Sequence, residues 1–394
     1  MQTDWNGPAD VVIVGGGVIG LSLALELLRR ERRVLLLERD RPGAGATFAA
    51  GGMLAPISEA ELEPAELIEL GRDSLNRYPQ FVADVERLGG FGCGYRDEGT
   101  LWVATNRDDR EELGRLEETM RLKSLEVQPL TPEQVGRLEP HLSGRVLGGL
   151  RVGTDHQIDP RKLTLGLRRA VEALGGRILC PARVESIEAQ AGRVTGVSGR
   201  GPNEERLDVR AARVILAAGA WSTDGIRQPA GSFGLRPIKG QLIRLNGPRL
   251  IEHVVRAPDV YLIPRSDGAL LVGATMEETG HDNSATAGAV LDLLRHAWQV
   301  LPGIYDLQFE EVSVGLRSAV ADHLPVIGPS AVENLYLAFG HFRNGILLAP
   351  ATAHYLADWI MQGRMPDALR SFQAERLAGR GAADPNEERE WTQA

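Results

Sequence analysis

The sequence has few cysteines, few aromatic residues and no long apolar run. Among its 394 residues there are two cysteines, Cys93 and Cys180, and aromatic residues make up 5%. Two cysteines cannot form a disulfide framework, so we expect a reducing, cytoplasmic location. No uninterrupted apolar stretch approaches the ~20 residues of a membrane helix. The composition therefore predicts a chain with no membrane partner.

The chain also lacks an excess of positive charge. Lysine and arginine number 44 against 53 acidic residues, giving a net charge of −9. This balance argues against nucleic acid or an anionic membrane as the main partner. We predict no metal site. The length suggests two domains, at ~100–200 residues per domain.

What the chain does have is a glycine motif near its start. The β-branched run Val11–Val14 predicts a strand buried on both faces. It leads into Gly15, Gly17 and Gly20, which have the spacing of a dinucleotide-binding fingerprint. Gly15 allows the tight turn, Gly17 lets the backbone approach a pyrophosphate, and Gly20 lets a helix pack closely on the strand.

The residues after the glycines complete the pattern. A helix is predicted over 18–30, and its N-terminus favours phosphate. Val34–Leu37 predicts the next parallel strand, which ends in Glu38. An acid at that position accepts hydrogen bonds from ribose hydroxyls and disfavours a ribose phosphate. The alternative is a glycine-rich turn in an ordinary α/β domain, and the motif alone does not separate NAD from FAD.

Further segments indicate how the chain is organised. The small residues of 43–52 predict a loop that lies against a flat ligand, and 59–86 predicts a helix. Buried β-α-β pieces return at 161–220, which predicts a discontinuous dinucleotide domain. Strands at 237–245, 260–265 and 269–275 alternate with turns, which is typical of an antiparallel sheet. Near the end, Pro350 is predicted in the first turn of a helix.

We therefore predict an α/β fold: a discontinuous Rossmann-type domain with an inserted substrate domain on a large antiparallel sheet. The predicted segments are 1–85, 151–228 and 315–394 for the dinucleotide domain, and 86–150 and 229–314 for the substrate domain.

Several motifs, taken in order, resemble the glycine oxidase (ThiO) branch of the D-amino-acid oxidase family of flavoproteins. The resemblance runs nearly end to end. Its most specific pieces are Ala50-Gly-Gly-Met-Leu-Ala-Pro, Pro237-Ile-Lys-Gly-Gln, Tyr261-Leu-Ile-Pro-Arg, Val272-Gly-Ala-Thr-Met, Gly315-Leu-Arg, and Gly340-His-Phe-Arg-Asn-Gly-Ile-Leu-Leu-Ala-Pro.

The resemblance implies FAD as the cofactor and assigns its contacts by position. The implied cofactor-binding residues are Gly15, Gly17, Val18, Ile19, Gly20, Glu38, Arg39, Ala46, Thr47, Gly51, Gly52, Met53, Val184, Ala218, Gly219, His341, Phe342, Arg343, Asn344, Gly345, Ile346 and Leu347. Related sarcosine oxidases attach flavin through a cysteine after the Gly-x-Arg strand. Residues 318–328 contain none, so the FAD is expected to be non-covalent.

The resemblance places substrate contacts and catalysis on Tyr261, Arg317 and Arg343, with Met53 and Met276 as pocket walls. An amino-acid carboxylate suits the planar, permanently charged fork of an arginine. The Asn344-Gly345 turn and the helix after it would offer donors to a reduced flavin. The alternatives are a surface salt bridge for Arg317, a core role for Tyr261, and plain packing for Met276.

Three residues depart from the family pattern. Asp259 stands where the best-known glycine oxidase has histidine, so it would hold a substrate ammonium or merely face water. Ser318 follows Arg317 where proline is common. Phe48 replaces a small polar residue expected near the flavin. These departures affect the expected specificity.

The implied function is oxidative deamination of glycine, sarcosine and small D-amino acids, with oxygen as acceptor and hydrogen peroxide as product. The resemblance also implies a role in the thiazole branch of thiamine synthesis and a homo-oligomer, a tetramer in the family. One alternative is a D-amino-acid or secondary-amine dehydrogenase with a non-oxygen acceptor. Another is a flavin-binding subunit without turnover, which would have no need of a carboxylate site.

Overall fold

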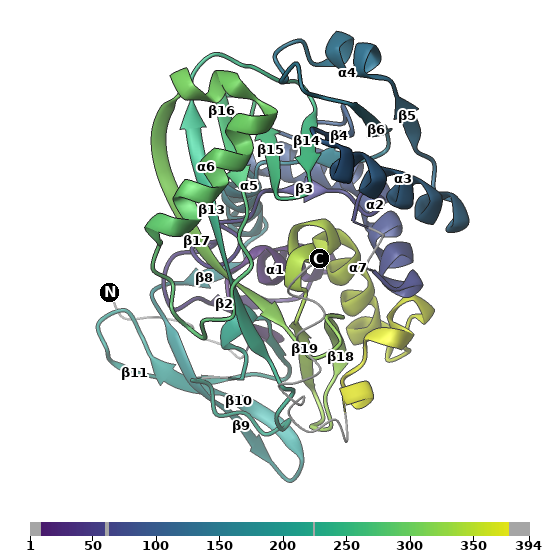
Figure 1. Cartoon of the computed structure of the whole chain (residues 1–394). Coiled ribbons are helices and arrows are strands. Elements are labelled where there is room, and N and C mark those ends of the chain that lie inside the picture. Colours follow the sequence, from purple (N-terminus) through teal and green to yellow (C-terminus); the bar gives the residue numbers. More distant parts are fainter. Residues whose placement is uncertain (1–8, 60–62, 224, 378–394) are drawn as a thin grey trace.

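The computed structural model describes residues 9–59, 63–223 and 225–377. Its first large sheet has the strand order β18-β19-β12-β1-β2-β8 (Figure 1). These strands are β1 (Val11–Val14), β2 (Val34–Leu37), β8 (Arg177–Leu179), β12 (Val214–Leu216), β18 (Val326–Pro329) and β19 (Leu335–Phe339). Neighbours run parallel except β18, which is antiparallel to β19.

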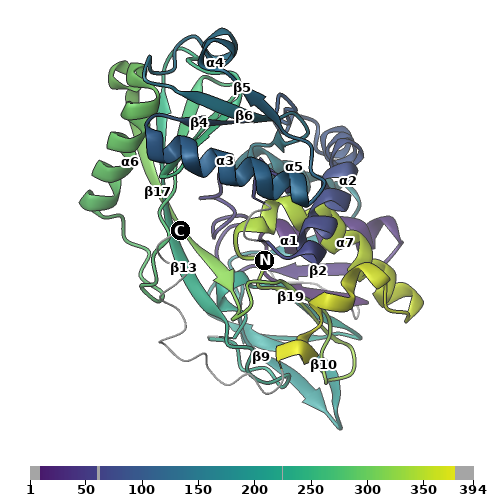
Figure 2. The same cartoon turned by 45° about the vertical axis from the view of Figure 1, so that its right-hand side comes forward.

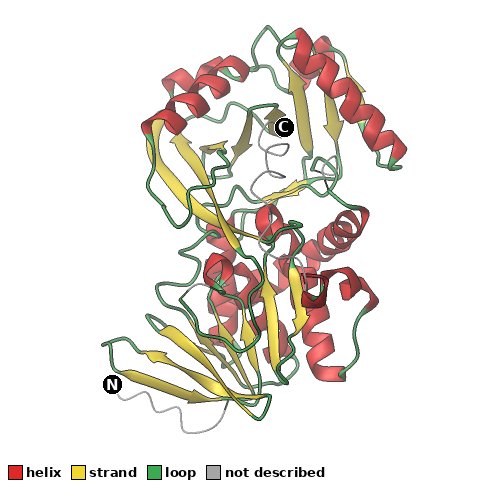
Figure 3. Cartoon of the chain, turned by 60° about the horizontal axis from the view of Figure 1, so that its bottom comes forward, coloured by secondary structure: helices red, strands yellow, loops and turns green. Residues whose placement is uncertain are grey.

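Both faces of this sheet are covered. On one face lie the mutually packed helices α1 (Val18–Arg29), α2 (Ala65–Gly89), α5 (Pro160–Ala173) and α7 (Gly345–Gln362). On the other lies a three-stranded sheet of β9 (Arg183–Gln190), β10 (Arg193–Arg200) and β11 (Arg206–Arg210), as Figure 3 shows. In β1, Val11 and Ile13 pack with the helices, whereas Val12 and Val14 pack toward the small sheet. The predicted strand buried on both faces is confirmed.

The second large sheet has the order β17-β13-β16-β15-β14-β4-β6-β5. Its strands are β4 (Thr100–Ala104), β5 (Gln128–Leu130), β6 (Gly148–Val152), β13 (Arg236–Asn246), β14 (Val254–Ala257), β15 (Val260–Pro264), β16 (Ala269–Gly273) and β17 (Gln308–Ala319). The predicted antiparallel sheet is confirmed except for one pair, because β14 runs parallel to β4. Figure 2 shows α3 (Arg107–Leu122), α4 (Pro132–Leu138) and α6 (Ala287–Val300) on this sheet.

Shorter elements connect these layers. They are β3 (Met53–Leu54), which pairs with β7 (His156–Gln157), and the 3-10 turns η1 (Gly219–Trp221), η2 (Pro302–Asp306), η3 (Phe342–Asn344), η4 (Asp367–Phe372) and η5 (Ala374–Leu377). In the described part of the chain, no helix is both long and apolar enough to cross a membrane.

The chain passes repeatedly between the two large sheets, which supports the discontinuous domain organisation. The five-segment division remains a proposal. Three of its boundaries, at 85/86, 150/151 and 314/315, fall inside α2, β6 and β17. The helix predicted from residue 59 begins instead at Ala65. Residues 60–62 of that prediction lie outside the described residues, and residues 56–59 form a turn.

The start of α7 is held by α2. Pro350 lies in the second turn of α7 rather than the predicted first turn. Because proline has no N–H, it cannot donate to the carbonyl of Ile346, four residues earlier. The buried Tyr78 hydroxyl of α2 donates to that carbonyl instead. Ser74 Oγ donates to the next carbonyl, that of Leu347, at 2.6 Å. These bonds fix the N-terminal end of α7.

Candidate active site

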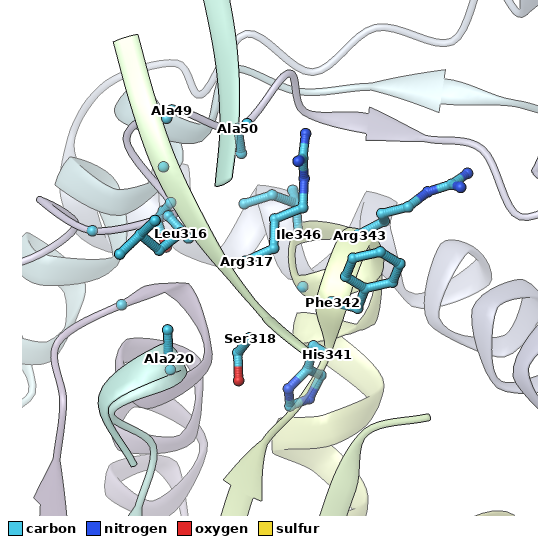
Figure 4. Close-up of a pocket in the computed structure, with 18 of the residues that line it drawn as sticks. Ala49, Ala50, Ala220, Leu316, Arg317, Ser318, His341, Phe342, Arg343 and Ile346 are labelled. Carbon is cyan, nitrogen blue, oxygen red and sulfur yellow. The ribbon is translucent and has the colours of Figure 1, made fainter. Parts of the chain in front are cut away.

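A cavity of about 1650 Å³ lies where the two large sheets meet. Its lining comes from the ends of β1, β2 and β12, from the loop before β3, from β13 to β17, and from the start of α7. Figure 4 shows the part of the cavity around Leu316, Arg317 and Ser318 of β17. The Arg317 side chain points upward in this view, to the side of Ala49 and Ala50, and that of Ser318 points downward. The site therefore joins segments from almost the whole chain.

One end of the cavity is built by the glycine motif. Gly15 and Gly17 line it at the N-terminus of α1, and Glu38 lines it at the end of β2. The Glu38 carboxylate accepts the backbone N–H of Gly16 at 2.7 Å and that of Asp40 at 2.9 Å. Glu38 thus supports the glycine turn and also presents its carboxylate to the cavity.

Gly20 differs from the other motif glycines. It does not line the cavity, and a Cβ at this position would collide with the carbonyl oxygen of Gly15. Its role is the close packing of α1 on β1 predicted for the third glycine, so direct cofactor contact is not supported. The predicted helix end at Arg30 is also one residue late, since α1 ends at Arg29.

An aromatic stack at the same end was not predicted from sequence. The Arg39 guanidinium lies 4.0 Å from the ring centre of Trp221, and the His281 ring lies 4.2 Å from it. All three residues line the cavity. The signal was present in the Gly219-Ala-Trp turn after β12, a place where ligands of α/β sheets gather.

The remaining predicted cofactor contacts line the cavity. They are Val18, Ile19, Arg39, Ala46, Thr47, Gly51, Gly52, Met53, Val184, Ala218, Gly219, His341, Phe342, Arg343, Asn344, Gly345, Ile346 and Leu347. Thr47 Oγ1 accepts the Val18 N–H at 3.2 Å and so ties the loop to α1. Burial lowers the pKa of His341 to about 3, and its Nε2 lies 3.1 Å from Thr352 Oγ1. That imidazole is neutral in the physiological range.

The chemistry of this lining fits a dinucleotide. A helix N-terminus suits a pyrophosphate, and the Glu38 carboxylate suits ribose hydroxyls. Gly45 and Gly219 line the cavity where an added Cβ would meet nothing within 4 Å, so backbone faces open space there. Neither Cys93 nor Cys180 lines the cavity, which agrees with a non-covalent cofactor.

The other end of the cavity holds Arg317 and Tyr261. The Arg317 guanidinium donates from Nη1 to the carbonyls of Thr275 at 3.1 Å and Lys239 at 3.4 Å. Burial lowers the pKa of Arg317 and raises that of Tyr261. An arginine nevertheless keeps its charge in a protein. A Cβ on Gly273 would lie 2.5–2.6 Å from the Tyr261 ring, so this glycine makes room for it.

Arg343 lies at the same end but belongs to an ion-pair cluster that the sequence did not reveal. Glu59 bridges two guanidiniums, with Oε1 2.8 Å from Arg256 Nη1 and Oε2 3.2 Å from Arg343 Nη2. Burial opposes ionisation of Glu59, but the two arginines outweigh it and lower its pKa to about 2. In sequence, the only hint was a charged residue, Arg256, inside an apolar strand.

The other predicted pocket residues, and two of the three departures from the family pattern, also line the cavity. Met53 and Met276 line the cavity, and Met276 is 47% exposed. Asp259 lies exposed in the turn between β14 and β15, at the rim. Ser318 lines the cavity, and its hydroxyl accepts the Gly340 N–H at 3.0 Å.

Phe48, expected near the flavin, does not line the cavity. The guanidiniums of Arg161 and Arg41 lie 3.7 Å and 5.1 Å from its ring centre. Its aromatic ring therefore serves a cation–π contact away from the cavity rather than the flavin pocket.

Comparison with known proteins agrees with this geometry. Residues 10–359 match the model of the DAO family, described as FAD dependent oxidoreductase. The chain belongs to this family. As a member of the FAD-dependent oxidoreductases, it uses FAD as its cofactor, and the lining described above is what the family leads one to expect.

Similar proteins cover nearly the whole chain. It is 31% identical over 371 residues to a glycine oxidase of Bacillus licheniformis, covering 93% of this chain and 97% of that protein. It is 34% identical over 382 residues to the bifunctional protein ThiO/ThiG of Trichormus variabilis, where it spans 95% of this chain but 56% of that protein. The chain thus spans about half the length of that relative.

A solved structure is similar as well. The crystal structure of glycine oxidase from Geobacillus kaustophilus aligns with a TM-score of 0.85 at 29% identity, covering 94% of this chain and 99% of that one. The similarity therefore extends across both large sheets and the cavity between them.

Proposed function

We propose that this chain oxidises glycine and small amines such as sarcosine and D-alanine to imines, which water hydrolyses to 2-oxo acids and ammonia or methylamine. The observation that carries the proposal is the pairing of Arg317 with Tyr261 at one end of the cavity. The names of the relatives, glycine oxidase and ThiO/ThiG, support the same substrate class.

Arg317 is proposed to bind the substrate carboxylate in two parallel hydrogen bonds, with the Tyr261 hydroxyl as a further donor. Its Nη1 is oriented by the Thr275 and Lys239 carbonyls, so little side-chain freedom is lost on binding. FAD, when bound, supplies the acceptor for the hydride that leaves the substrate α-carbon. The start of α7 directs its N–H groups toward the cavity, where they favour negative charge.

No side chain needs to act as a base in this proposal. His341 is buried and neutral, and Glu59 is committed to two arginines. The substrate therefore reacts with its amine already neutral, and the protein contributes position and charge. Oxygen is the proposed final acceptor, giving hydrogen peroxide. A role in the thiazole branch of thiamine synthesis and a homotetramer belong to the same proposal.

The test is a peroxide assay on the FAD-loaded protein with glycine, sarcosine, D-alanine, D-proline and D-phenylalanine. We expect glycine, sarcosine and D-alanine to be turned over, and D-phenylalanine to be poor. Glycinamide, which has the amine but no carboxylate, is the matched control and is expected to react poorly. If glycine reduces the flavin anaerobically but no peroxide forms in air, the protein is instead a dehydrogenase. If glycinamide is turned over as well as glycine, the proposed carboxylate site is wrong.

A further inference from the structure

We infer that the substrate end of the cavity contains a second carboxylate subsite, formed by Arg256 and Arg343, which accepts amines that carry two acidic groups. The inference rests on the proposed function, since Arg317 is taken to hold the first carboxylate. It extends the substrate class from monoacids to amines with an additional carboxylate on the nitrogen or the side chain.

The first observation is an excess of donors. A guanidinium has five N–H donors, and a carboxylate has two oxygens. Glu59 gives one oxygen to Arg256 and the other to Arg343. Of the described residues, only Glu59 and the Met53 sulfur accept a hydrogen bond from Arg256, both through Nη1. Both guanidiniums line the cavity, so their remaining donors are available to a ligand.

The second observation is the charge balance. Among the described residues, three guanidiniums line this end of the cavity, those of Arg256, Arg317 and Arg343. The carboxylate of Glu59 lies between two of them, and those of Glu112 and Asp259 lie at the rim. Glu63 lies outside the lining and accepts a hydrogen bond from Asn344. Burial raises its pKa, and its carboxylate also faces the charge of Arg343. With one substrate carboxylate on Arg317, Arg256 and Arg343 still share the carboxylate of Glu59, so a second substrate carboxylate would give these two guanidiniums a further anionic partner.

The third observation is that Arg256 is held in place without substrate. Its guanidinium lies 4.5 Å from the ring centre of Trp102, and its side chain is 13% exposed. A fixed, largely desolvated guanidinium binds an anion more strongly than a mobile surface arginine, because little entropy is lost and water screens poorly.

At the rim, Arg115 attracts an acidic substrate, while Asp259 and Glu112 oppose it.

The two arginines come from different layers. Arg256 belongs to β14 and Arg343 to η3, directly before α7. Figure 4 shows Arg317 and Arg343 leaving neighbouring elements with their guanidinium ends apart. In this inference, one carboxylate of a small molecule binds Arg317 and the other binds Arg343 and Arg256.

The experiment compares isosteric substrates that differ in one charge. kcat/KM is measured for iminodiacetate against its monoamide, and for D-aspartate against D-asparagine. We expect the diacid to be preferred about tenfold or more in at least one pair, and the pair that responds tells whether the second carboxylate is carried on the nitrogen or on the side chain. Equal rates for acid and amide in both pairs would overturn the subsite.

Two variants move the preference in opposite directions. Arg256→Gln is expected to bring the diacid-to-amide ratio close to one, whereas Glu59→Gln is expected to raise it severalfold. A merely structural cluster would lower all rates together in both variants. The double variant Glu59→Gln/Arg256→Gln removes both charges of this pair, although Arg343 then lacks its carboxylate partner, and it is the fallback if Arg256→Gln does not fold. The diacid-to-amide ratio of kcat/KM in the double variant must also be lower than the ratio in Glu59→Gln.

Arg244→Gln is the matched control. Arg244 lies on the same sheet with a similar exposure of 14%, pairs with Asp267 and Glu310, and does not line the cavity. Its ratio is expected to stay at the wild-type value. A parallel measurement uses the change in flavin absorbance on binding of succinate and its monoamide succinamate. If glycine is not oxidised but succinate binds tighter in an Arg256-dependent way, the proposed function fails while the subsite stands.

Discussion

Gly240 leaves the space that the Arg317 guanidinium occupies. The two residues lie on the neighbouring strands β13 and β17, and a Cβ added to Gly240 would collide with Nη1, Nη2 and Cζ of Arg317. A glycine is therefore needed in Pro237-Ile-Lys-Gly-Gln because of a side chain on the neighbouring strand, and not because of the conformation of its own strand. The position of Arg317, the residue proposed to bind the substrate carboxylate, therefore depends on a glycine of the neighbouring strand, two residues beyond its register partner Ile238.

Gly240→Ala should therefore displace Arg317 and lower activity without loss of FAD. A displacement of about 1 Å can cost on the order of a hundredfold in rate, so we expect kcat/KM for glycine to fall at least tenfold. Gly288→Ala on α6 is the control, because a Cβ there meets nothing within 4 Å. Wild-type kinetics in Gly240→Ala would mean that Arg317 has room to move without consequence.

Arg317→Ala should remove the binding partner of the substrate carboxylate. Losing one partner of a buried charge pair costs ~3–5 kcal/mol, so kcat/KM for glycine should fall by about a hundred to several thousandfold. Arg317→Lys should recover part of the loss, since the charge returns without the fork. FAD content is measured in both variants. If activity falls only in proportion to lost FAD, Arg317 is structural and the carboxylate binds elsewhere, with Arg343 the next candidate.

Glu38→Ala should weaken FAD binding. Two hydrogen bonds from ribose hydroxyls to a charged acceptor are proposed here, each worth ~1.5–3 kcal/mol. The carboxylate also holds the N–H of Gly16 at the pyrophosphate turn. We expect the Kd for FAD to rise by about a hundredfold or more in a titration of the apoprotein. Glu188→Ala, on β9 and outside the cavity, should leave the Kd unchanged.

Tyr78→Phe should destabilise the start of α7. The Ile346 carbonyl, which Pro350 cannot serve, would be left unsatisfied in a buried place. An unsatisfied buried acceptor costs ~1–3 kcal/mol, which should appear in the free energy of unfolding from denaturant titration. Tyr355→Phe on α7 is the comparison, because its half-buried hydroxyl contacts Arg77 near the surface. Equal free energies of unfolding in the two variants would argue that the Tyr78 hydroxyl does not replace the missing N–H of Pro350.

Asp155→Asn should stabilise the protein more at pH 8 than at pH 5. Burial raises the pKa of Asp155 to about 7, whereas an unfolded aspartate titrates near ~3.9. Between these values the folded state binds more protons, so the free energy of unfolding falls as the pH rises and levels off above 7. The asparagine does not titrate and still accepts from Ser58, whose hydroxyl donates to Asp155.

We expect a difference between the two pH values on the order of 1–3 kcal/mol, measured by denaturant unfolding at saturating FAD. A gain or loss that is the same at pH 5 and pH 8 would show that Asp155 does not titrate in this range.

The sequence by itself determined the local parts of this protein. The order Val11–Val14, glycine turn, helix and Glu38 follows from steric limits and hydrogen-bonding needs within about thirty residues, so the dinucleotide end could be predicted closely. The same holds for the strands with strict alternation. Arg317 and Tyr261 came from family motifs, and the structure brings both to one end of the cavity.

Only the tertiary structure decided the rest. Glu59, Arg256 and Arg343 are separated by about two hundred and by nearly ninety residues, and their pairing depends on where the two sheets meet. The parallel pairing of β14 with β4 carries Arg256 to Trp102, its partner in register. Local propensity contains no information on such contacts, because ion pairs between distant segments form only once the packing of both cores has fixed the distances between them.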